Sequence, residues 1–276
     1  MDALLSLENI TVRFKRRDGS SFAALDDVSL KVPDGGAVGL VGESGSGKTT
    51  LVRVACGLQK PDSGRVVFGA TGEVEGQRSE VEGQRSEVEG PRSKVESPTQ
   101  LAHTSRAASG IQMIFQDAIG ALDPRQRVGD AIAEVGRVHR IPVDVDALLS
   151  QVGLPCEVAR RYPSELSGGQ CQRICIARAL AMKPSLLIGD EPVSALDVSV
   201  QARILRLLGD LREKNGLSLL IITHDLAVVS ALCDYVYVLE KGRVVEEGEP
   251  ESIFAASSHP YTRRLLASVP RVPENR

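Results

Sequence analysis

A glycine-rich loop at residues 42–49 constrains the fold of this chain more than any other feature of its sequence. The loop reads GESGSGKT, matches the pattern GxxxxGK[ST], and lies between the apolar run AVGLV and the helical pattern KTTLVRVACGL. Between a strand and a helix, such glycines let backbone N–H groups turn inward around phosphate oxygens. Lys48 then reaches the terminal phosphates, and the Thr49 hydroxyl can hold Mg²⁺. The residues expected to cradle the phosphates are Gly42, Glu43, Ser44, Gly45, Ser46, Gly47, Lys48, Thr49 and Thr50.

Alternating apolar runs and helical patterns predict an α/β fold with a mainly parallel sheet. The runs SLLIGD and SLLIIT flank the helical segment SVQARILRLLGDLREK, which is the order expected of βαβ units. Ligands bind at the carboxyl ends of the strands in such sheets. The phosphate loop, the acids Asp190 and Glu191, and His224 each follow one of these strands, so we expect them to meet at one edge. Residues 4–32 and 64–69, with the turn sequences DGSS, PDGG and PDSG, predict a separate antiparallel lobe of short strands.

Composition excludes several classes of protein. A chain of 276 residues with 42% hydrophobic content can bury a sizeable core, so it is expected to be globular. Its formal charge of −3 comes without a long Lys/Arg run, and the sequence therefore predicts no nucleic-acid partner. Five cysteines without a CxxC pair suit a reducing compartment. Cys171 and Cys175, four apart on an expected helix, are interpreted as small buried side chains.

Targeting signals are not evident. The sequence MDALLSLENI lacks the basic start and apolar stretch of a secretory signal. No run of about 18 apolar residues is present that could span a bilayer. We therefore expect a chain that is not exported and whose membrane role, if any, is peripheral.

A seven-residue repeat interrupts the chain. EVEGQRS occurs at 73–79 and 80–86, followed by EVEGPRS and the decayed KVESPTQ. Each unit offers one valine and usually a glycine, which costs about 1 kcal/mol in a helix, so a coiled-coil seam cannot form. So polar a tract cannot offset its ordering entropy. We interpret residues 71–109 as a low-complexity, disordered insertion whose repeats occupy 73–96; a partner-binding element is the alternative.

Two further motifs carry chemistry. Asp190 suits Mg²⁺ organisation and Glu191 suits polarisation of an attacking water, although a helix N-cap would explain two such acids about as well. The motif LSGGQ at 166–170 begins the helical run CQRICIARAL, where N–H groups and the helix dipole favour phosphate. This second cradle consists of Ser167, Gly168, Gly169 and Gln170. One chain with two phosphate cradles requires an explanation.

These motifs closely resemble those of the nucleotide-binding domains of ABC transporters, whose signature is LSGGQ, and the resemblance covers nearly the whole chain except the repeats. It implies one domain over 1–276 with a P-loop NTPase fold: a mainly parallel core sheet, an antiparallel β subdomain, and a helical subdomain at 117–180. In that family two domains pair head to tail, so that each ATP lies between one subunit's P-loop and the other's signature. The resemblance thus accounts for both cradles and implies ATP and Mg²⁺ as ligands.

The resemblance also implies further site residues. Gln116 in IQMIFQD looks like the residue that senses Mg²⁺ and the membrane partner, and His224 looks like the switch histidine that contacts the γ-phosphate. Phe14 sits where the family usually stacks an aromatic ring on adenine, with a core strand residue as the alternative. The implied catalytic residues are Glu191, His224, Gln116 and Lys48. The implied metal-binding residues are Thr49, Gln116 and Asp190.

Three stretches are similar to the ATPase subunits of importers for dipeptides, oligopeptides, glutathione or nickel: IQMIFQDAIGALDPRQRVGDAI, EPVSALDVSVQARIL and, in the tail at 246–276, HPYTRRLLASVP. Such systems combine two ATPase subunits, two transmembrane permease subunits and an extracytoplasmic substrate-binding protein. The resemblance implies a peripheral place on the cytoplasmic face of the inner membrane. An exporter ATPase, a soluble ABC ATPase acting on ribosomes or DNA, and a non-catalytic member of a heterodimer are the alternatives.

Overall fold

The computed structural model describes residues 3–16, 19–69 and 110–267. The predicted insertion at 71–109, with its heptad repeats, lies outside the described residues, as does the end of the predicted tail beyond residue 267. Within the described residues, no helix combines the length and apolarity needed to cross a membrane.

A six-stranded sheet forms the centre of the fold, in the order β5-β6-β7-β3-β8-β9. The first five strands of this order run parallel, and β9 pairs antiparallel with β8. This arrangement confirms the mainly parallel sheet predicted from the sequence. The strands are β3 (Ala37–Val41), β5 (Ile111–Ile114), β6 (Leu186–Asp190), β7 (Ser218–Thr223), β8 (Tyr235–Glu240) and β9 (Arg243–Gly248).

The central strands are apolar throughout because both faces of the sheet are covered. Side chains alternate along β7: Leu219 and Ile221 enter one hydrophobic cluster, while Leu220 and Ile222 enter another on the opposite face. The first cluster contains residues of the helices, and the second contains residues of an antiparallel sheet and α1 (Lys48–Ala55). A parallel sheet buried on both faces is expected to read as continuous apolar runs, as these strands do.

A second sheet of three antiparallel strands, in the order β2-β1-β4, covers one of these faces. It consists of β1 (Ala3–Lys15), β2 (Ser21–Pro33) and β4 (Ser63–Phe68). The antiparallel lobe is confirmed, but β1 and β2 run for 13 residues each, where short strands were expected. Register shifts along the β1–β2 pair explain the difference, because a bulge lets a strand bend and continue where a regular pair would end.

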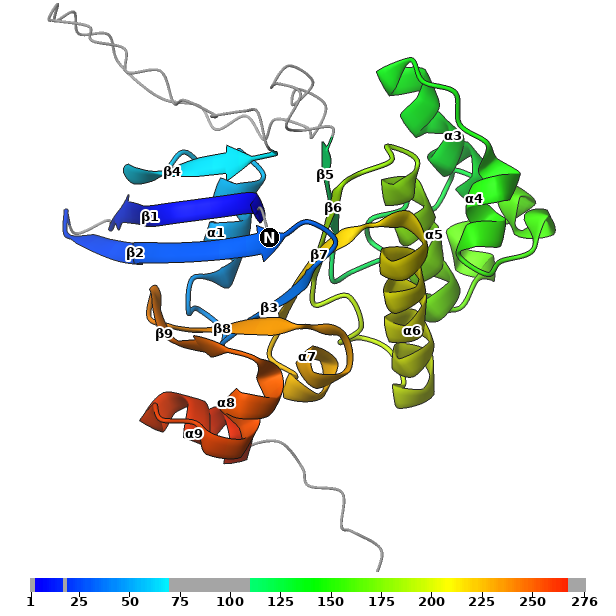
Figure 1. The fold of residues 1–276 in the computed structure, drawn as a ribbon. Coiled ribbons are helices and arrows are strands. Elements are labelled where there is room, and N and C mark those ends of the chain that lie inside the picture. Colours follow the sequence, from blue (N-terminus) through cyan, green and yellow to red (C-terminus); the bar gives the residue numbers. More distant parts are fainter. Residues whose placement is uncertain (1–2, 17–18, 70–109, 268–276) are drawn as a thin grey trace, which may run out of the picture.

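Helices pack on the opposite face of the central sheet. The helices α3 (Val128–His139), α4 (Val145–Gln151) and α5 (Gly168–Leu180) gather away from the antiparallel sheet (Figure 1). The short 3₁₀ helices η2 (Cys156–Arg160) and η3 (Pro163–Glu165) connect α4 with α5. Next come α6 (Val198–Asn215) and α7 (Leu226–Leu232). Cys171 and Cys175 of α5 are both buried, as interpreted from their spacing.

Two short helices, α8 (Pro250–Ala256) and α9 (Pro260–Ala267), follow the last strand. Glu246 of β9 holds the entry to α9, because its carboxylate accepts hydrogen bonds from the Ser257 hydroxyl at 2.9 Å and from the Ser258 amide at 2.7 Å. Burial alone would raise the pKa of Glu246, but the nearby Thr262 hydroxyl and the hydrogen bonds from Ser258 and Ser257 outweigh it and lower the pKa to about 2. The carboxylate therefore anchors the C-terminal segment in its charged form.

Replacing Glu246 by glutamine tests this anchor. Because the folded-state pKa of about 2 lies below the ordinary value of 4.5, the carboxylate contributes stability that is present above pH 4.5 and lost as the pH falls towards 2. We expect Glu246→Gln to lower the free energy of unfolding by on the order of 1 kcal/mol at pH 7, allowing for solvent screening. Below pH 4.5 the deficit should shrink.

Thermal unfolding between pH 7 and pH 3 measures this deficit. Glu213→Gln, which removes an exposed carboxylate on α6, is the control. A deficit of the same size at every pH would contradict the anchoring role of the charge.

Candidate active site

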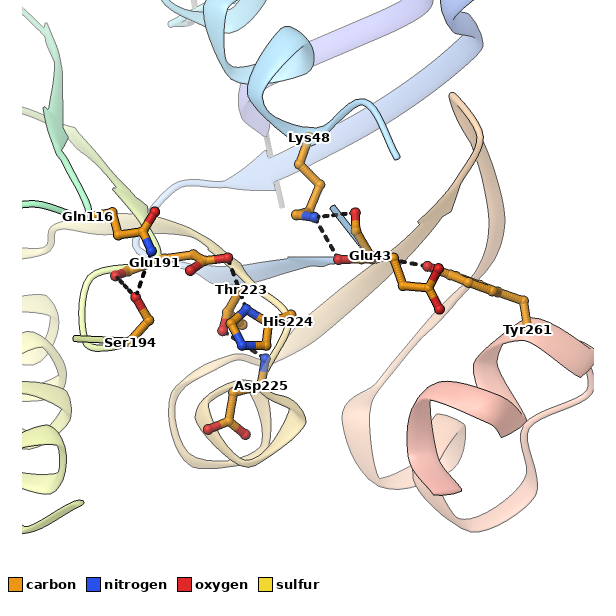
Figure 2. A network of polar contacts seen from close by, with 10 residues as sticks. Glu43, Lys48, Gln116, Glu191, Ser194, Thr223, His224, Asp225 and Tyr261 are labelled. Atoms are coloured by element: carbon orange, nitrogen blue, oxygen red, sulfur yellow. Dashed lines mark hydrogen bonds and ion pairs between the residues drawn. The ribbon is translucent and has the colours of Figure 1, made fainter. Parts of the chain in front are cut away.

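The ends of three parallel strands bring the predicted site residues together. Val41, the last residue of β3, pairs with Thr223, the last residue of β7, and Asp190 at the end of β6 pairs with Ile222. The segments that follow these strands must therefore leave the sheet at one edge. Figure 2 shows Lys48, Glu191 and His224 at this edge. The structure thus brings together the groups that the sequence predicted to meet there.

The phosphate loop follows a path that only glycine permits at its last turn. Gly47, the N-cap of α1, has a φ of 112°, a backbone conformation that side chains other than hydrogen disfavour. A Cβ on Gly47 would lie 2.6 Å from the carbonyl oxygen of Ala24 on β2. A Cβ on Gly42 would lie 2.3 Å from the carbonyl oxygen of Leu239. The loop is therefore enclosed by β2 on one side and β8 on the other.

Lys48 points its ammonium back across this loop. Its Nζ atom donates to the carbonyl oxygens of Gly42 at 2.6 Å and Glu43 at 2.8 Å. Burial lowers the pKa of Lys48, and the charges of Glu191, Asp190 and Glu43 oppose this change. Since an ammonium has three donors, these two bonds leave one for an anion. A buried, charged donor at the first turn of a helix is suited to phosphate.

Ser46 provides a second polar group inside the loop. The residue is 5% exposed, and its hydroxyl has no hydrogen-bond partner within the described part of the chain. A buried hydroxyl without a partner carries a desolvation cost. A phosphate oxygen or a metal-bound water at this loop would supply the missing partner, so the residues fit an anionic ligand.

The acid pair occupies a strained turn after β6. Glu191 has a φ of 47°, although its amide still donates to the carbonyl oxygen of Ile222 at 2.8 Å. Its carboxylate lies 2.9 Å from Nδ1 of His224, whose side chain is 60% exposed. Burial and the neighbouring charge of Glu191 raise the pKa of Asp190, while Lys48 and Arg53 lower it. The site thus combines two carboxylates, an ammonium and an imidazole.

Gln116 reaches this group from β5. Its Nε2 atom donates to the Ser194 hydroxyl at 3.3 Å, and that hydroxyl donates to the carbonyl oxygen of Glu191 at 3.2 Å. The amide of Gln116 and the loop that begins at Ser194 are therefore joined to the acid pair (Figure 2). The sequence had placed Gln116 and Ser194 in separate motifs, and the bond between them emerges only from the fold.

The donor set fits Mg²⁺ together with a nucleotide. Mg²⁺ prefers oxygen ligands and is usually bound through one or two carboxylates plus substrate phosphates. Asp190 offers the carboxylate, Thr49 an exposed hydroxyl beside the loop, and Gln116 an amide oxygen. When bound, the ion would neutralise charge on the phosphate oxygens.

The signature residues lie apart from the phosphate loop. Ser167 caps α5 and forms a capping box with Gln170, with bonds of 3.3 Å and 3.0 Å between their side chains and amides. Gly169 packs against α6, where a Cβ would lie 2.4 Å from Val200 Cγ1. Across residues 3–16, 19–69 and 110–267, no hydrogen bond or ion pair joins the signature to the phosphate loop. The structure therefore does not bring the two predicted cradles together within one chain.

Phe14 lies near the end of β1, half-buried against the antiparallel sheet. Its ring is 5.8 Å from the ring of Phe22 on β2, and the Arg16 guanidinium lies 5.1 Å from the centre of the Phe22 ring. Phe14 is thus a member of a partly exposed aromatic pair, and the packing fits both the adenine-stacking and the core-strand interpretations.

Tyr261 was not among the predicted site residues. Its hydroxyl accepts a hydrogen bond of 2.7 Å from the Glu43 amide in the phosphate loop, across a sequence separation of 218 residues (Figure 2). In the sequence, the segment HPYTRR indicated only a resemblance to a subfamily. No periodicity or spacing signal could have linked Tyr261 to residue 43.

Comparisons with known proteins agree with this geometry. The family described as ABC transporter matches residues 25–194. The oligopeptide transport ATP-binding protein OppF of Escherichia coli is 39% identical, over 97% of this chain and 78% of that protein. A Brucella abortus protein provisionally named a peptide import ATP-binding protein is 46% identical, over 90% of this chain and 70% of that protein.

Two solved structures have the same fold. CbiO1 of Clostridium perfringens, part of the ABC transporter complex CbiONQ, has a TM-score of 0.71 at 26% identity, over 92% of each chain. An ATP-binding cassette solved as a dimer in a post-hydrolysis state with ADP and Pi has a TM-score of 0.69 at 25% identity, over 89% of this chain and 98% of that one.

The enclosure of Gly47 gives a stability prediction. Gly47→Ala should be destabilised both by the left-handed backbone, at about 1–2 kcal/mol, and by overpacking against the Ala24 carbonyl, at about 1–3 kcal/mol. Gly35→Ala is the matched control, because Gly35 also has a positive φ of 67° but, in the described part of the chain, no neighbouring atom lies within 4 Å of its added Cβ. Denaturant unfolding measures both variants, and equal losses would contradict the close approach of β2.

Proposed function

This chain belongs to the ABC transporter family as an ATP-hydrolysing subunit, and we propose that its turnover powers an importer of di- or oligopeptides. The observation that carries the peptide assignment is the 39–46% identity, over 90–97% of the chain, to proteins named for peptide import or oligopeptide transport. Nickel is a second cargo class that the sequence resemblance allows.

We assign the chemistry to the residues gathered at the sheet edge. The loop amides other than that of Glu43, which is bound by Tyr261, hold the triphosphate of ATP together with Lys48 and Ser46. Asp190, Thr49 and Gln116 would hold Mg²⁺. Glu191 polarises the attacking water, since its carboxylate lies 2.9 Å from His224 and its charge acts on the ammonium of Lys48. His224 orients that carboxylate and contacts the γ-phosphate. Positioning and electrostatic stabilisation dominate phosphoryl transfer, and these fixed groups supply this chain's part of both.

A complete site requires a second ATPase subunit. Among the residues that the structure describes, the signature amides at the start of α5 have no hydrogen bond to the phosphate loop of their own chain, and Ser167 is exposed to solvent. A partner subunit placed head to tail would present its own signature to the ATP bound here. This chain would in turn present its signature to the ATP bound by the partner. ATP binding would then close the dimer, and hydrolysis would allow it to reopen.

The proposed assembly includes two transmembrane permease subunits, with the ATPase bound peripherally at the cytoplasmic face of the inner membrane. An extracytoplasmic substrate-binding protein would deliver the peptide to the permease. Gln116 lies beside the exposed Phe115, so the strand end that meets the acid pair also reaches the surface. A contact there would link a permease to the hydrolysis site without touching the transported substrate.

Purification of the tagged chain from native membranes tests the assembly. We expect two multi-span permease subunits and a second ATPase to be recovered with it, and a substrate-binding protein that binds peptides to be part of the same system. Recovery of the chain alone, or with ribosomes, would overturn the transport assignment while leaving the ATPase chemistry intact. Recovery of a substrate-binding protein that binds nickel would instead assign nickel as the transported substrate.

Glu191→Gln tests the catalytic assignment. The variant should bind ATP and dimerise but lose turnover by about 100-fold or more, because a general base contributes about 10²–10⁴ to the rate. ATP binding, dimerisation in the presence of ATP, and phosphate release are measured for the variant and for Glu213→Gln, an exposed control on α6. Near-normal phosphate release by Glu191→Gln would refute the role of Glu191.

A further inference from the structure

The phenol of Tyr261 contacts the phosphate loop from outside. Its hydroxyl accepts the Glu43 N–H at 2.7 Å, and the residue is only 2% exposed. Tyr261 belongs to α9, whereas Glu43 lies two residues after the end of β3, so the bond joins the C-terminal segment to the loop that holds Lys48. Figure 2 shows the ring extending from α9 towards Glu43.

The phenol is held in place by several interactions. The Tyr261 amide donates to Nδ1 of His259 at 3.2 Å, and the Arg264 guanidinium lies 5.7 Å from the centre of the ring. Arg264 also pairs with Glu240 of β8 at 3.5 Å. Together with the Glu246 anchor described above, these contacts fix the hydroxyl relative to the central sheet. Burial raises the pKa of Tyr261, so the hydroxyl stays neutral at physiological pH.

The peptide unit between Gly42 and Glu43 is held at both of its polar ends. Its N–H, on Glu43, is bound by Tyr261, and its carbonyl oxygen, on Gly42, accepts from Lys48 Nζ at 2.6 Å. A peptide unit is planar, so fixing its N–H also fixes the direction of its carbonyl. The unit therefore presents the Gly42 carbonyl to the ammonium from a defined position, and the place of the ammonium depends on a residue far along the chain.

We propose that Tyr261 is a positioning residue for ATP binding, acting through the Glu43 amide to pre-organise the phosphate loop and the ammonium of Lys48. This inference rests on the ATPase function proposed above. Pre-organisation lowers the entropic cost of ordering the loop when ATP binds. It stabilises bound ATP and the transition state of hydrolysis by the same amount. Loss of the bond should therefore raise KM for ATP and leave kcat nearly unchanged.

Tyr261→Phe removes the hydroxyl and keeps the ring. The matched control is Tyr237→Phe, because Tyr237 is 7% exposed and its hydroxyl also accepts a backbone N–H, from Lys31 at 3.2 Å, away from the phosphate loop. Both variants lose one hydrogen bond between a tyrosine and the backbone, so their losses of folding stability should be similar. Only Tyr261→Phe should weaken the binding of the nucleotide.

The measurements are the Kd of the full chain for Mg-ATP by calorimetry, KM and kcat of the assembled transporter, and the melting temperature of each variant. We expect Tyr261→Phe to raise Kd and KM by about three- to tenfold, the size of one hydrogen bond, with kcat changed less than about twofold. Tyr237→Phe should leave Kd, KM and kcat unchanged.

Equal Kd values for the two variants would overturn the positioning role, as would a fall in kcat without a change in KM. Wild-type chain that binds no Mg-ATP would instead overturn the proposed function, and this inference with it. Failure of the positioning role can therefore be told apart from failure of the proposed function, because the first is observed only when the wild-type chain binds Mg-ATP.

Discussion

The register between β6, β7 and β3 is the constraint on which the rest of the site depends. Asp190 pairs with Ile222, and Val41 pairs with Thr223. The segments that follow β6, β7 and β3 therefore begin at the same edge of the sheet. A shift of one residue in β6 would turn Asp190 and Glu191 to the opposite faces of the sheet. The close packing of particular apolar side chains on the two faces holds this register. The burial that stabilises the fold therefore also places the acids at the edge that carries Lys48.

Much of this arrangement was predictable because it follows from local patterns. The strand–loop–helix context of residues 42–49, the apolar runs that end at Asp190 and Thr223, and the rule that ligands bind at the carboxyl ends of parallel strands together led to one sheet edge. The order of β3, β6 and β7 did not need to be known. The roles of Gln116 and His224 came from resemblance, and the geometry adds their bonds to Ser194 and Glu191.

The features that escaped prediction are contacts between distant residues. Periodicity describes which side of an element is buried but does not name the partner, so neither Tyr261 with Glu43 nor Gly169 with Val200 could be foreseen. Gly169 was interpreted only as part of an anion cradle, yet its lack of a side chain also lets α5 approach α6. The long β1 and β2 were missed because bulges carry little sequence signal.

The backbone of Glu191 places stability and turnover in opposition. A φ of 47° is unfavourable for glutamate by about 1–2 kcal/mol, and glycine would relieve it. Glycine would also remove the carboxylate that lies against His224. Selection for thermal stability alone would therefore favour glycine at this position, although hydrolysis needs the glutamate. To retain an active enzyme, the rest of the fold must compensate for the unfavourable backbone conformation of Glu191.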